Sequence, residues 1–511
     1  MNPVPKKSLE SQVSNASLWG LVHQIVTAVS AFVSAPIIIG ALGRENYGSW
    51  LLIFSLVAYL EFLDFGFSNT VIRFLSLKSK SKNERSNAST EQFFRKHFAR
   101  ISVVATIAAI VLTLFSSDLE SYFPDLKDYL SLFFKALLVH TIFFYARFHS
   151  AFLRSQFRYN TLYSISISRT AIYLITIYFA PTAYLTLENL LHLFLLLYST
   201  EQIFIILSSK LMSKSASTKA LSKGTQHEIF GHASKNFLGS LAIIIRHRAD
   251  YQILAMNVGL SSVSQYGIAM RIPHLFTDII NAVFGSHFVA AFSRIQGEGK
   301  EEKAINATHF SLRLASAIAL SGGTLIYFLA PPFIYCWIGS GFEDAQLMVR
   351  IVIPGFVLMA MHYPVASFMS AINRYEAIAI PGLIGAFINI GLSIYLTHDF
   401  GVFGVILGTM LDALIFGAIF IPFVASRPLR LTTSEYCTRF ILLPVIKMTL
   451  CWLPFTILNS YWVLDSFLEL ALAGSLQIVP LTLVSWFLIL SEQDRKLIEP
   501  QLRAILKKLA R

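Results

Sequence analysis

Charged residues and cysteines are both scarce in this sequence. Of its 511 residues, 14% are charged and 55% are hydrophobic, whereas soluble domains carry about a quarter charged residues. The three cysteines, Cys336, Cys437 and Cys451, are too few for a disulfide framework. Apolar residues stand in continuous runs, without the alternating pattern of a membrane β-barrel. These features predict an all-α polytopic membrane protein.

Sequence signatures of catalysis are also missing. There is no Walker A motif, and the run Gly297–Lys300 lacks both its spacing and the Ser or Thr that follows the lysine. We find no HExxH, CxxC or DxD motif, and no large extramembrane domain that would house an active site. The sequence therefore predicts a protein that is not an enzyme, with no catalytic residues, no metal site and no cofactor.

Fourteen apolar segments are long enough to cross a bilayer at about 1.5 Å per residue. Each is expected to be helical, because lipid offers no hydrogen-bond partner to the backbone. An even number of spans places both termini on the same side of the membrane. The segments lie near 17–39, 47–72, 98–117, 129–152, 164–181, 186–208, 236–258, 264–291, 308–330, 346–371, 376–397, 401–424, 440–459 and 466–490.

The connections between these segments are alternately rich in lysine and arginine and nearly free of them. One set holds Arg44 and Lys127 alone, whereas the opposite set includes the basic stretches 78–97, 209–235 and 491–511. Cytoplasmic loops carry the excess of Lys and Arg, so both termini are expected in the cytoplasm. The net charge of +12 then reflects topology and contact with membrane lipids, and we expect no nucleic-acid partner.

A polar, Ser- and Lys-rich connection at 209–235 separates six segments from eight. Beyond it, Val258-Gly259 and Tyr266-Gly267 repeat Ile39-Gly40 and Tyr47-Gly48 at the same point of the topology, as in transporters that contain parallel repeats. We therefore expect an N-lobe at 1–208, a cytoplasmic linker at 209–235, a C-lobe at 236–424, two added helices at 425–490 and a cytoplasmic amphipathic tail at 491–511.

Ionisable side chains lie at membrane depth in three segments, where a lipid-facing charge is costly and a protein cavity or partner is expected. Segment 47–72 has two carboxylates three residues apart, on one helix face, and segment 264–291 has a stripe at i, i+3 and i+7. Segment 236–258 carries two arginines and an aspartate close to its middle. The residues are Glu61 and Asp64; Arg246, Arg248 and Asp250; and Arg271, His274 and Asp278.

Two explanations of these charges stay open. Arg246 and Asp250, at i and i+4, form an ion pair that neutralises itself inside the bundle, or these helices line a cationic cavity for an anionic substrate. Arg248 lies roughly 200° around the helix from Arg246. The two arginines therefore face one cavity only if the helix is broken or the cavity is wide.

Two stretches resemble a known family. GRENYGSWLLIFSLVAYLEFLDFGFSNTVIRF, residues 43–74, resembles the second-helix signature of the bacterial polysaccharide transporter family, and AFSRIQGEGKEEK at 291–303 is similar to the cytoplasmic exit after its eighth helix. That family belongs to the multidrug/oligosaccharidyl-lipid/polysaccharide superfamily. The resemblance implies two six-helix lobes around a central cavity lined by helices 1, 2, 7 and 8, plus two C-terminal helices.

The resemblance also implies a flippase that translocates undecaprenyl-diphosphate-linked oligosaccharide across the bacterial cytoplasmic (inner) membrane for O-antigen or exopolysaccharide biosynthesis. Alternating access would carry the polar head through the cavity while the polyprenyl tail stays in lipid. The implied partners are this substrate, membrane lipids, a polysaccharide polymerase and a chain-length regulator. Arg246, Arg248, Arg271 and His274 would bind substrate, and Glu61, Asp64, Asp250 and Asp278 would pair with these cations or carry a coupling H⁺ or Na⁺.

Other functions stay open at this point. A cation-coupled multidrug exporter of the same superfamily would favour an acidic, aromatic cavity, whereas a peptidoglycan-precursor flippase would also use a basic one. A polysaccharide polymerase or membrane glycosyltransferase would carry a long extracytoplasmic loop, and the spacing of the apolar segments leaves no room for one.

The charge asymmetry predicts which connections an external reagent reaches. In a cysteine-free background, single cysteines at 118–128 or 340–345 should react with an impermeant thiol reagent added to whole cells. Cysteines at 209–235 should be protected, because that basic connection is expected in the cytoplasm. Labelling is measured as a mass shift of the protein. Reaction at 209–235 in intact cells would contradict the predicted orientation.

Overall fold

The computed structural model describes residues 9–78, 84–115, 129–212, 221–285, 299–372, 376–462 and 464–509, together with 288, 289, 292, 295 and 374. Every regular element in these residues is a helix, so the predicted all-α fold is confirmed. Contacts between the helices divide the chain into two compact units, Met1–Ser264 (unit 1) and Gln265–Arg511 (unit 2).

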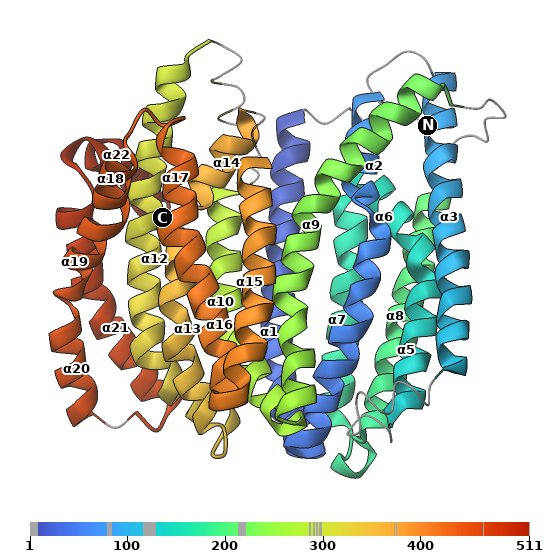
Figure 1. Ribbon diagram of the computed structural model, residues 1–511, viewed down its shortest axis with the longest axis horizontal. Helices are drawn as coiled ribbons and strands as arrows, with labels where there is room; N and C mark the ends of the chain where they lie inside the picture. The colour runs from blue at the N-terminus through green and yellow to red at the C-terminus, as the bar shows by residue number, and fades with distance from the viewer. Residues whose placement is uncertain are drawn as a thin grey trace. The chain divides into compact units, whose positions relative to one another are not determined.

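Unit 1 is a bundle of helices (Figure 1), and three of its connections contain a short 3-10 segment. Its elements are α1 (Leu9–Val57), η1 (Ala58–Asp64), α2 (Phe67–Lys78), α3 (Glu84–Leu114), α5 (Leu130–Ile142), η3 (Phe143–Tyr145), α6 (Ala146–Ser155), α7 (Tyr159–Phe179), η4 (Thr182–Tyr184), α8 (Leu187–Lys210) and α9 (Lys223–Asn257). α1 packs against α7, and α6 packs against both α2 and α8. α9 is part of this unit and contacts α1, η1 and α2.

Unit 2 is a second helical bundle, which α10 (Leu260–Phe284) enters after its first turn. Its other elements are α12 (Glu301–Ile338), α13 (Glu343–Met361), α14 (Tyr363–Ala371), α15 (Glu376–Phe400), α16 (Val402–Ile415), η5 (Phe416–Phe420), α17 (Ile421–Ser426), α18 (Thr433–Cys437), η6 (Thr438–Leu442), α19 (Leu443–Thr449), α20 (Trp452–Tyr461), α21 (Phe467–Val484), η7 (Ser485–Ile489) and α22 (Glu492–Leu509). α12 packs against α13, α19 and α21, and α16 packs against α13 and α15. The lobe boundaries predicted from the sequence stay a prediction.

The corner between the first two predicted spans is a bend within α1. Gly43 has a φ of 75°, a left-handed conformation that glycine adopts at little cost. Beyond the bend, a Cβ on Gly48 would lie 2.0 Å from the Leu260 carbonyl oxygen, so only glycine allows this close approach of the two backbones. Gly259, in the second copy of the motif, is also left-handed, with a φ of 110°.

The sequence predicts one helix over 47–72, and this prediction is wrong because the helix is interrupted. The helix tightens into η1 and ends at Phe65 and Gly66, whose φ values are 45° and 74°, before α2 begins. At this break the backbone passes close to α9, because a Cβ on Gly66 would lie 2.3 Å from the Ala233 carbonyl oxygen. The left-handed turn thus lies where α9 comes close. The apolar periodicity of the sequence gives no sign of this turn.

Ten helices among the described residues are long and apolar enough to span a membrane, or eleven if the bent pair Thr433–Thr449 and Trp452–Asn459 forms one span. α1 counts once, although the sequence divides it into two spans, and α9 and α10 are outside the ten. The protein is thus a multi-pass membrane protein, and the total of fourteen spans stays a prediction.

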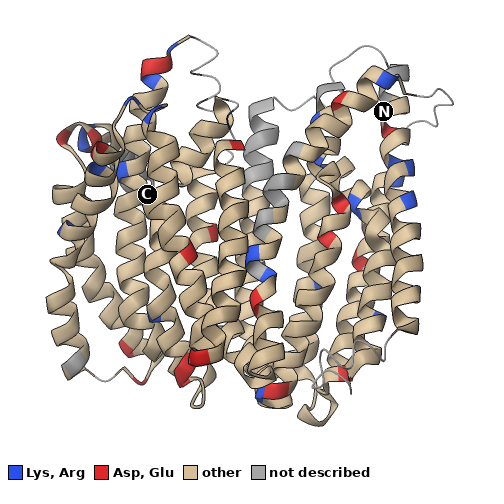
Figure 2. Ribbon diagram, in the orientation of Figure 1, with Lys and Arg blue, Asp and Glu red and all other residues tan. Residues whose placement is uncertain are grey.

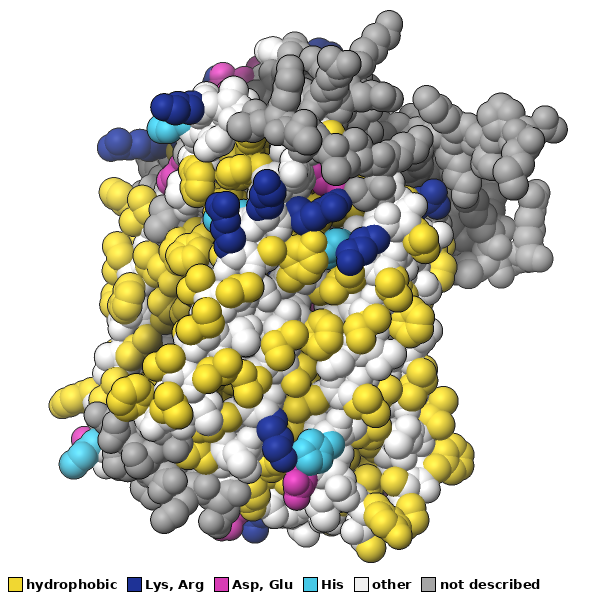
Figure 3. Space-filling model, turned by 90° about the vertical axis from the view of Figure 1, so that its right-hand side faces the viewer, with side chains coloured by type: hydrophobic (Ala, Val, Ile, Leu, Met, Phe, Trp, Pro, Cys, Tyr) yellow, Lys and Arg dark blue, Asp and Glu magenta, His cyan; other side chains and the backbone are white. Residues whose placement is uncertain are grey.

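Figure 3 shows hydrophobic side chains over one face of unit 1, with Lys and Arg gathered toward one edge.

Each unit has an aromatic core of its own. In unit 1, phenylalanines of α2, α3 and α6 pack together, among them the fully buried Phe94 and Phe148. In unit 2, the buried Tyr436 packs with Phe440, and its hydroxyl is 2.9 Å from Nδ1 of His362. The buried Tyr436 hydroxyl is thereby paired with a side chain of another helix.

The C-terminal segment forms α22, which is fastened to unit 2 at its first turn. The hydroxyl of Ser491 accepts a hydrogen bond from the Asp494 backbone at 3.2 Å, and the Ser491 N–H donates to the Asp494 carboxylate at 2.9 Å. The guanidinium of Arg313 in α12 donates twice to the same carboxylate, at 2.6 and 2.7 Å. Side chains beyond Pro500 lie outside the described residues, so the amphipathic tail stays a prediction.

The Arg313–Asp494 pair predicts a pH-dependent contribution to stability. Asp494 is 1% exposed, and although burial opposes its charge, hydrogen bonds from Arg313 and Ser491 hold the pKa of this carboxyl below its ordinary value of 3.8. Asp494→Asn should therefore cost about 2 kcal/mol of unfolding free energy at neutral pH, because the half-buried Arg313 loses its charged hydrogen-bond partner. The difference from wild type should persist above the ordinary carboxyl pKa and vanish as the pH falls through the lower folded-state pKa.

Thermal unfolding of the purified protein across pH measures this effect. Glu492→Gln is the matched control, because Glu492 pairs with Lys496 on the surface, where both side chains are 73% exposed. The control should behave as wild type at every pH. An Asp494→Asn protein as stable as wild type at neutral pH would show that the pair contributes nothing.

Candidate substrate-binding site

α9 brings charged side chains into the interior of unit 1. It is one uninterrupted helix of 35 residues and packs against α1, η1 and α2. Figure 2 shows Lys or Arg and acidic residues part-way along α9, away from both ends. The site is therefore built on an unbroken helix that contacts the end of α1.

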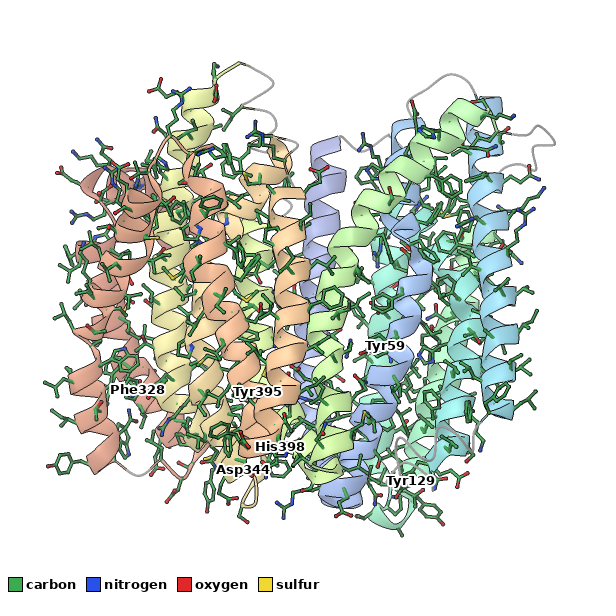
Figure 4. The ribbon with its side chains drawn as sticks, viewed as in Figure 1. Tyr59, Tyr129, Phe328, Asp344, Tyr395 and His398 are labelled. Carbon is green, nitrogen blue, oxygen red and sulfur yellow. The ribbon has the colours of Figure 1, made fainter. Side chains whose placement is uncertain are left out.

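A chain of hydrogen bonds links α9 to the end of α1. The Tyr59 hydroxyl lies 3.1 Å from Oε1 of Gln252, and Nε2 of Gln252 donates to the Ser55 hydroxyl at 2.7 Å. Tyr59 lies beside α9 in Figure 4, close enough to Arg248 and Asp250 for their charges to act on its hydroxyl. The polar surface between α1 and α9 therefore includes neutral donors and acceptors as well as charges.

The charges of α9 itself differ in environment. Asp250 is fully buried, whereas Arg246 and Arg248 are each half-buried. Because α9 is unbroken, the two arginines point to opposite sides of the helix, roughly 200° apart. A single ligand could therefore contact both arginines only if it extended around the helix from one side of α9 to the other.

Glu61 pairs with a residue that the sequence analysis did not select. Its carboxylate lies 3.6 Å from the guanidinium of Arg147 in α6, and the two side chains are 47% and 37% exposed. The Arg147 guanidinium also stands over the ring of Phe144 at 5.3 Å. Such an exposed pair is weak, so both groups remain open to exchange of partners.

Asp64 has a different setting, although it is only three residues from Glu61. It is 9% exposed, and its carboxylate accepts hydrogen bonds from the Ser68 hydroxyl and from the Ser68 N–H, the latter at 3.1 Å. These bonds cap the first turn of α2. Asp64 thus holds the break between η1 and α2 in place.

The other predicted site residues lie on α10 in unit 2. Arg271 and His274 are half-buried and Asp278 is exposed, and α10 is helical through all three, so their shared stripe is kept. The His274 ring packs 5.6 Å from Phe356 of α13.

The structure therefore gathers the predicted residues into two groups, one in each unit. Glu61, Asp64, Arg246, Arg248 and Asp250 belong to unit 1. Arg271, His274 and Asp278 belong to unit 2. Their roles in binding substrate or a coupling ion stay predictions.

Another buried ion pair in unit 1 was missed as well. Nε of Arg169 in α7 is 2.9 Å from the Glu201 carboxylate in α8, and Glu201 is 8% exposed. Ser166 also donates to this carboxylate, and the Arg169 guanidinium stands over Phe194 at 5.7 Å. The sequence separates the two charges by 32 positions, so no helical spacing connects them.

The described residues contain no group of three or more His, Cys, Asp or Glu side chains that could hold a metal ion. The described side chains at the α1–α9 surface include charged groups and neutral hydrogen-bonding groups. Arginine can bind phosphate or carboxylate groups, and neutral donors such as Tyr59 can bind hydroxyl groups.

These features define the protein as a polytopic helical membrane protein with ionisable side chains inside a helical bundle, as in transporters. It belongs to the polysaccharide biosynthesis protein family, whose model matches residues 41–347. The chain is also similar to the uncharacterized membrane protein EpsK of Bacillus subtilis (strain 168), with 21% identity over 495 residues that cover 93% of this chain and 95% of EpsK.

The fold is shared with solved structures. An inward-facing multidrug resistance MATE family transporter of the MOP superfamily matches with a TM-score of 0.67 and 14% identity, covering 81% of this chain and 99% of its own. The lipid II flippase MurJ, in an inward closed conformation, matches with a TM-score of 0.65 and 15% identity, covering 92% and 98%. At these identities the likeness shows the fold alone.

The Arg169–Glu201 pair predicts a stability effect separate from substrate binding. Glu201→Leu should lower the amount of folded protein, because the half-buried Arg169 loses its charged hydrogen-bond partner, which costs about 1–3 kcal/mol. Replacing both residues by leucine should restore it, because well-packed apolar residues can substitute for a buried pair. Size-exclusion profiles of the solubilised variants give the measurement. A double variant no better folded than Glu201→Leu would show that these two charges do not act as a pair.

Proposed function

We propose that the protein is a flippase that moves lipid-linked oligosaccharides across the bacterial cytoplasmic membrane for the synthesis of a surface polysaccharide. Membership of a polysaccharide biosynthesis family supports the pathway. A fold shared with a lipid II flippase supports translocation of a sugar carried on a lipid. The substrate class is an undecaprenyl-diphosphate oligosaccharide, such as an O-antigen or exopolysaccharide repeat unit.

The observation that carries this proposal is the charge in the middle of α9. Arg246 and Arg248 stand far from both ends of a helix that packs on α1. A guanidinium binds phosphate oxygens through paired hydrogen bonds, so arginines at this depth suit the diphosphate of the head group. In unit 2, Arg271 and His274 on α10 are the proposed hydrogen-bond donors to the same head group.

Carboxylates neutralise these cations while the site is empty. Asp250 is fully buried on the same helix as both arginines, and Glu61 is only weakly paired with Arg147, at 3.6 Å, so it is free to exchange partners. When the diphosphate takes over the arginines, Asp250, Glu61, Asp64 and Asp278 are the groups that bind a coupling H⁺ or Na⁺. This exchange links substrate binding to the conformational change of alternating access.

In the cell, the protein acts in the inner membrane with both termini in the cytoplasm. It supplies translocated repeat units to a polysaccharide polymerase, and a chain-length regulator is a further partner. A multidrug exporter would need a cavity for organic cations, which the arginines of α9 oppose by charge. A peptidoglycan-precursor flippase would use the same diphosphate chemistry, and the phenotype of a deletion strain separates the two.

Substitutions at Arg246 and Asp250 test the proposal against a purely structural ion pair. Arg246→Ala should lower both protein level and transport, because it leaves Asp250 buried without that charge. Arg246→Leu combined with Asp250→Leu should restore the protein level, because replacing both members of a buried pair with apolar residues is nearly neutral. Transport should stay lost, since the diphosphate ligand is gone, whereas Arg246→Lys should keep part of it.

The measurement is surface polysaccharide in a complemented deletion strain, with protein quantified by immunoblot. The matched control is the leucine double variant at Arg169 and Glu201, a buried pair outside the proposed site, which should keep both level and polysaccharide. A well-expressed Arg246 and Asp250 double variant with wild-type polysaccharide would remove Arg246 from the site and leave Arg248 and Arg271.

A further inference from the structure

A basic pocket opens on unit 2 beside the start of α22. It has a volume of about 210 Å³. Its basic side chains come from two parts of the chain, His309 and Arg313 on α12, and Arg439 and Lys447 on the stretch from η6 to α19. Phe440 and Leu443 are among the apolar residues that complete the wall.

The pocket carries net positive charge. Arg313 is neutralised by Asp494 through two short hydrogen bonds. Arg439 has a carboxylate of Glu435 only at 3.8 Å, with 59% and 47% of the two side chains exposed, so solvent screens this pair. Nζ of Lys447 donates at 2.6 Å to the backbone carbonyl of Leu488, a neutral acceptor. Arg439 and Lys447 therefore leave positive charge available to an anion.

The pocket lies at the end of a membrane span. Lys447 bonds to the last turn of the candidate span Phe467–Ile489, and Ile489 itself lines the pocket. Apolar side chains of the same elements are exposed around it, with Leu442 and Ile446 each 53% and Phe487 59% exposed. A cationic recess beside exposed apolar side chains, at the end of a span, matches the head group and acyl chains of an anionic phospholipid.

We propose that this pocket binds the phosphate of an anionic phospholipid, with Arg439 and Lys447 as its ligands. The acyl chains lie along the exposed apolar residues of η6, α19 and η7. Through the lipid, α19 and η7 are tied to α12 next to the Arg313–Asp494 pair, so the lipid stabilises the C-terminal helices of unit 2. This site does not depend on the proposed transport function, because none of its residues belongs to the candidate substrate site.

Lipid titration of the full-length protein tests the proposal. Phosphatidylglycerol is added to protein in phosphatidylcholine nanodiscs, and bound lipid is counted by native mass spectrometry. A membrane-surface cation contributes about fivefold to anionic-lipid binding. Arg439→Gln combined with Lys447→Gln should therefore weaken phosphatidylglycerol binding roughly 30-fold.

The control is Arg430→Gln combined with Lys496→Gln, which removes the same charge from residues that do not line the pocket. This control should weaken phosphatidylglycerol binding far less than the Arg439 and Lys447 double variant, because its charges lie outside the pocket and solvent screens them. Equal binding by the Arg439 and Lys447 double variant would overturn the proposal. Inorganic phosphate that displaces phosphatidylglycerol at equal concentration would also overturn it, because the pocket would then take a soluble anion.

A measurement on the wild-type chain keeps the proposal testable if the double variant does not fold. An amine-reactive reagent should modify Lys447 several-fold more slowly in nanodiscs with phosphatidylglycerol than in phosphatidylcholine alone, as read from peptide masses. The exposed Lys496, which pairs with Glu492, should react equally in both. Unchanged modification of Lys447 would contradict lipid binding at this pocket.

Discussion

A charge inside the bilayer needs a partner within the protein, and this constraint organises the structure. In unit 1, Arg169 and Glu201 meet at 2.9 Å between α7 and α8. Asp64 is buried because the first turn of α2 supplies its hydrogen bonds. In unit 2, Arg313 is fixed by Asp494 in two hydrogen bonds at the first turn of α22. Each of these contacts is made between segments distant in sequence or across a break in a helix.

α9 and α10, which carry all the predicted site residues except Glu61 and Asp64, share one property. α9 and α10 are outside the set of helices that qualify as spans by length and apolarity, because charge interrupts their apolar runs. Their polar surfaces are tolerable only where protein or water covers them. The charged residues that weaken these helices as membrane spans are also the ones that the proposed substrate site uses.

The sequence predicts the class of fold well, because lipid allows only one backbone solution for long apolar runs. Prediction from sequence fails where contacts between distant residues determine the local backbone conformation. At Phe65 and Gly66, for example, the close approach of α9 accompanies a left-handed turn. Ion pairs and hydrogen bonds between distant residues are missed for the same reason. Nothing in the sequence marks Arg147 as the partner of Glu61, from which it lies 3.6 Å, or Gln252 as the partner of Tyr59.

Translocation itself is the central claim, and reconstituted vesicles test it most directly. A fluorescent undecaprenyl-diphosphate oligosaccharide is incorporated into both leaflets, and an impermeant reagent that destroys the label is added outside. The account predicts that vesicles containing the protein lose the inner-leaflet signal as well, and that Arg246→Leu with Asp250→Leu vesicles retain it as protein-free vesicles do. Retention of the inner-leaflet signal with correctly folded wild-type protein, in the presence of both H⁺ and Na⁺ gradients, would contradict it.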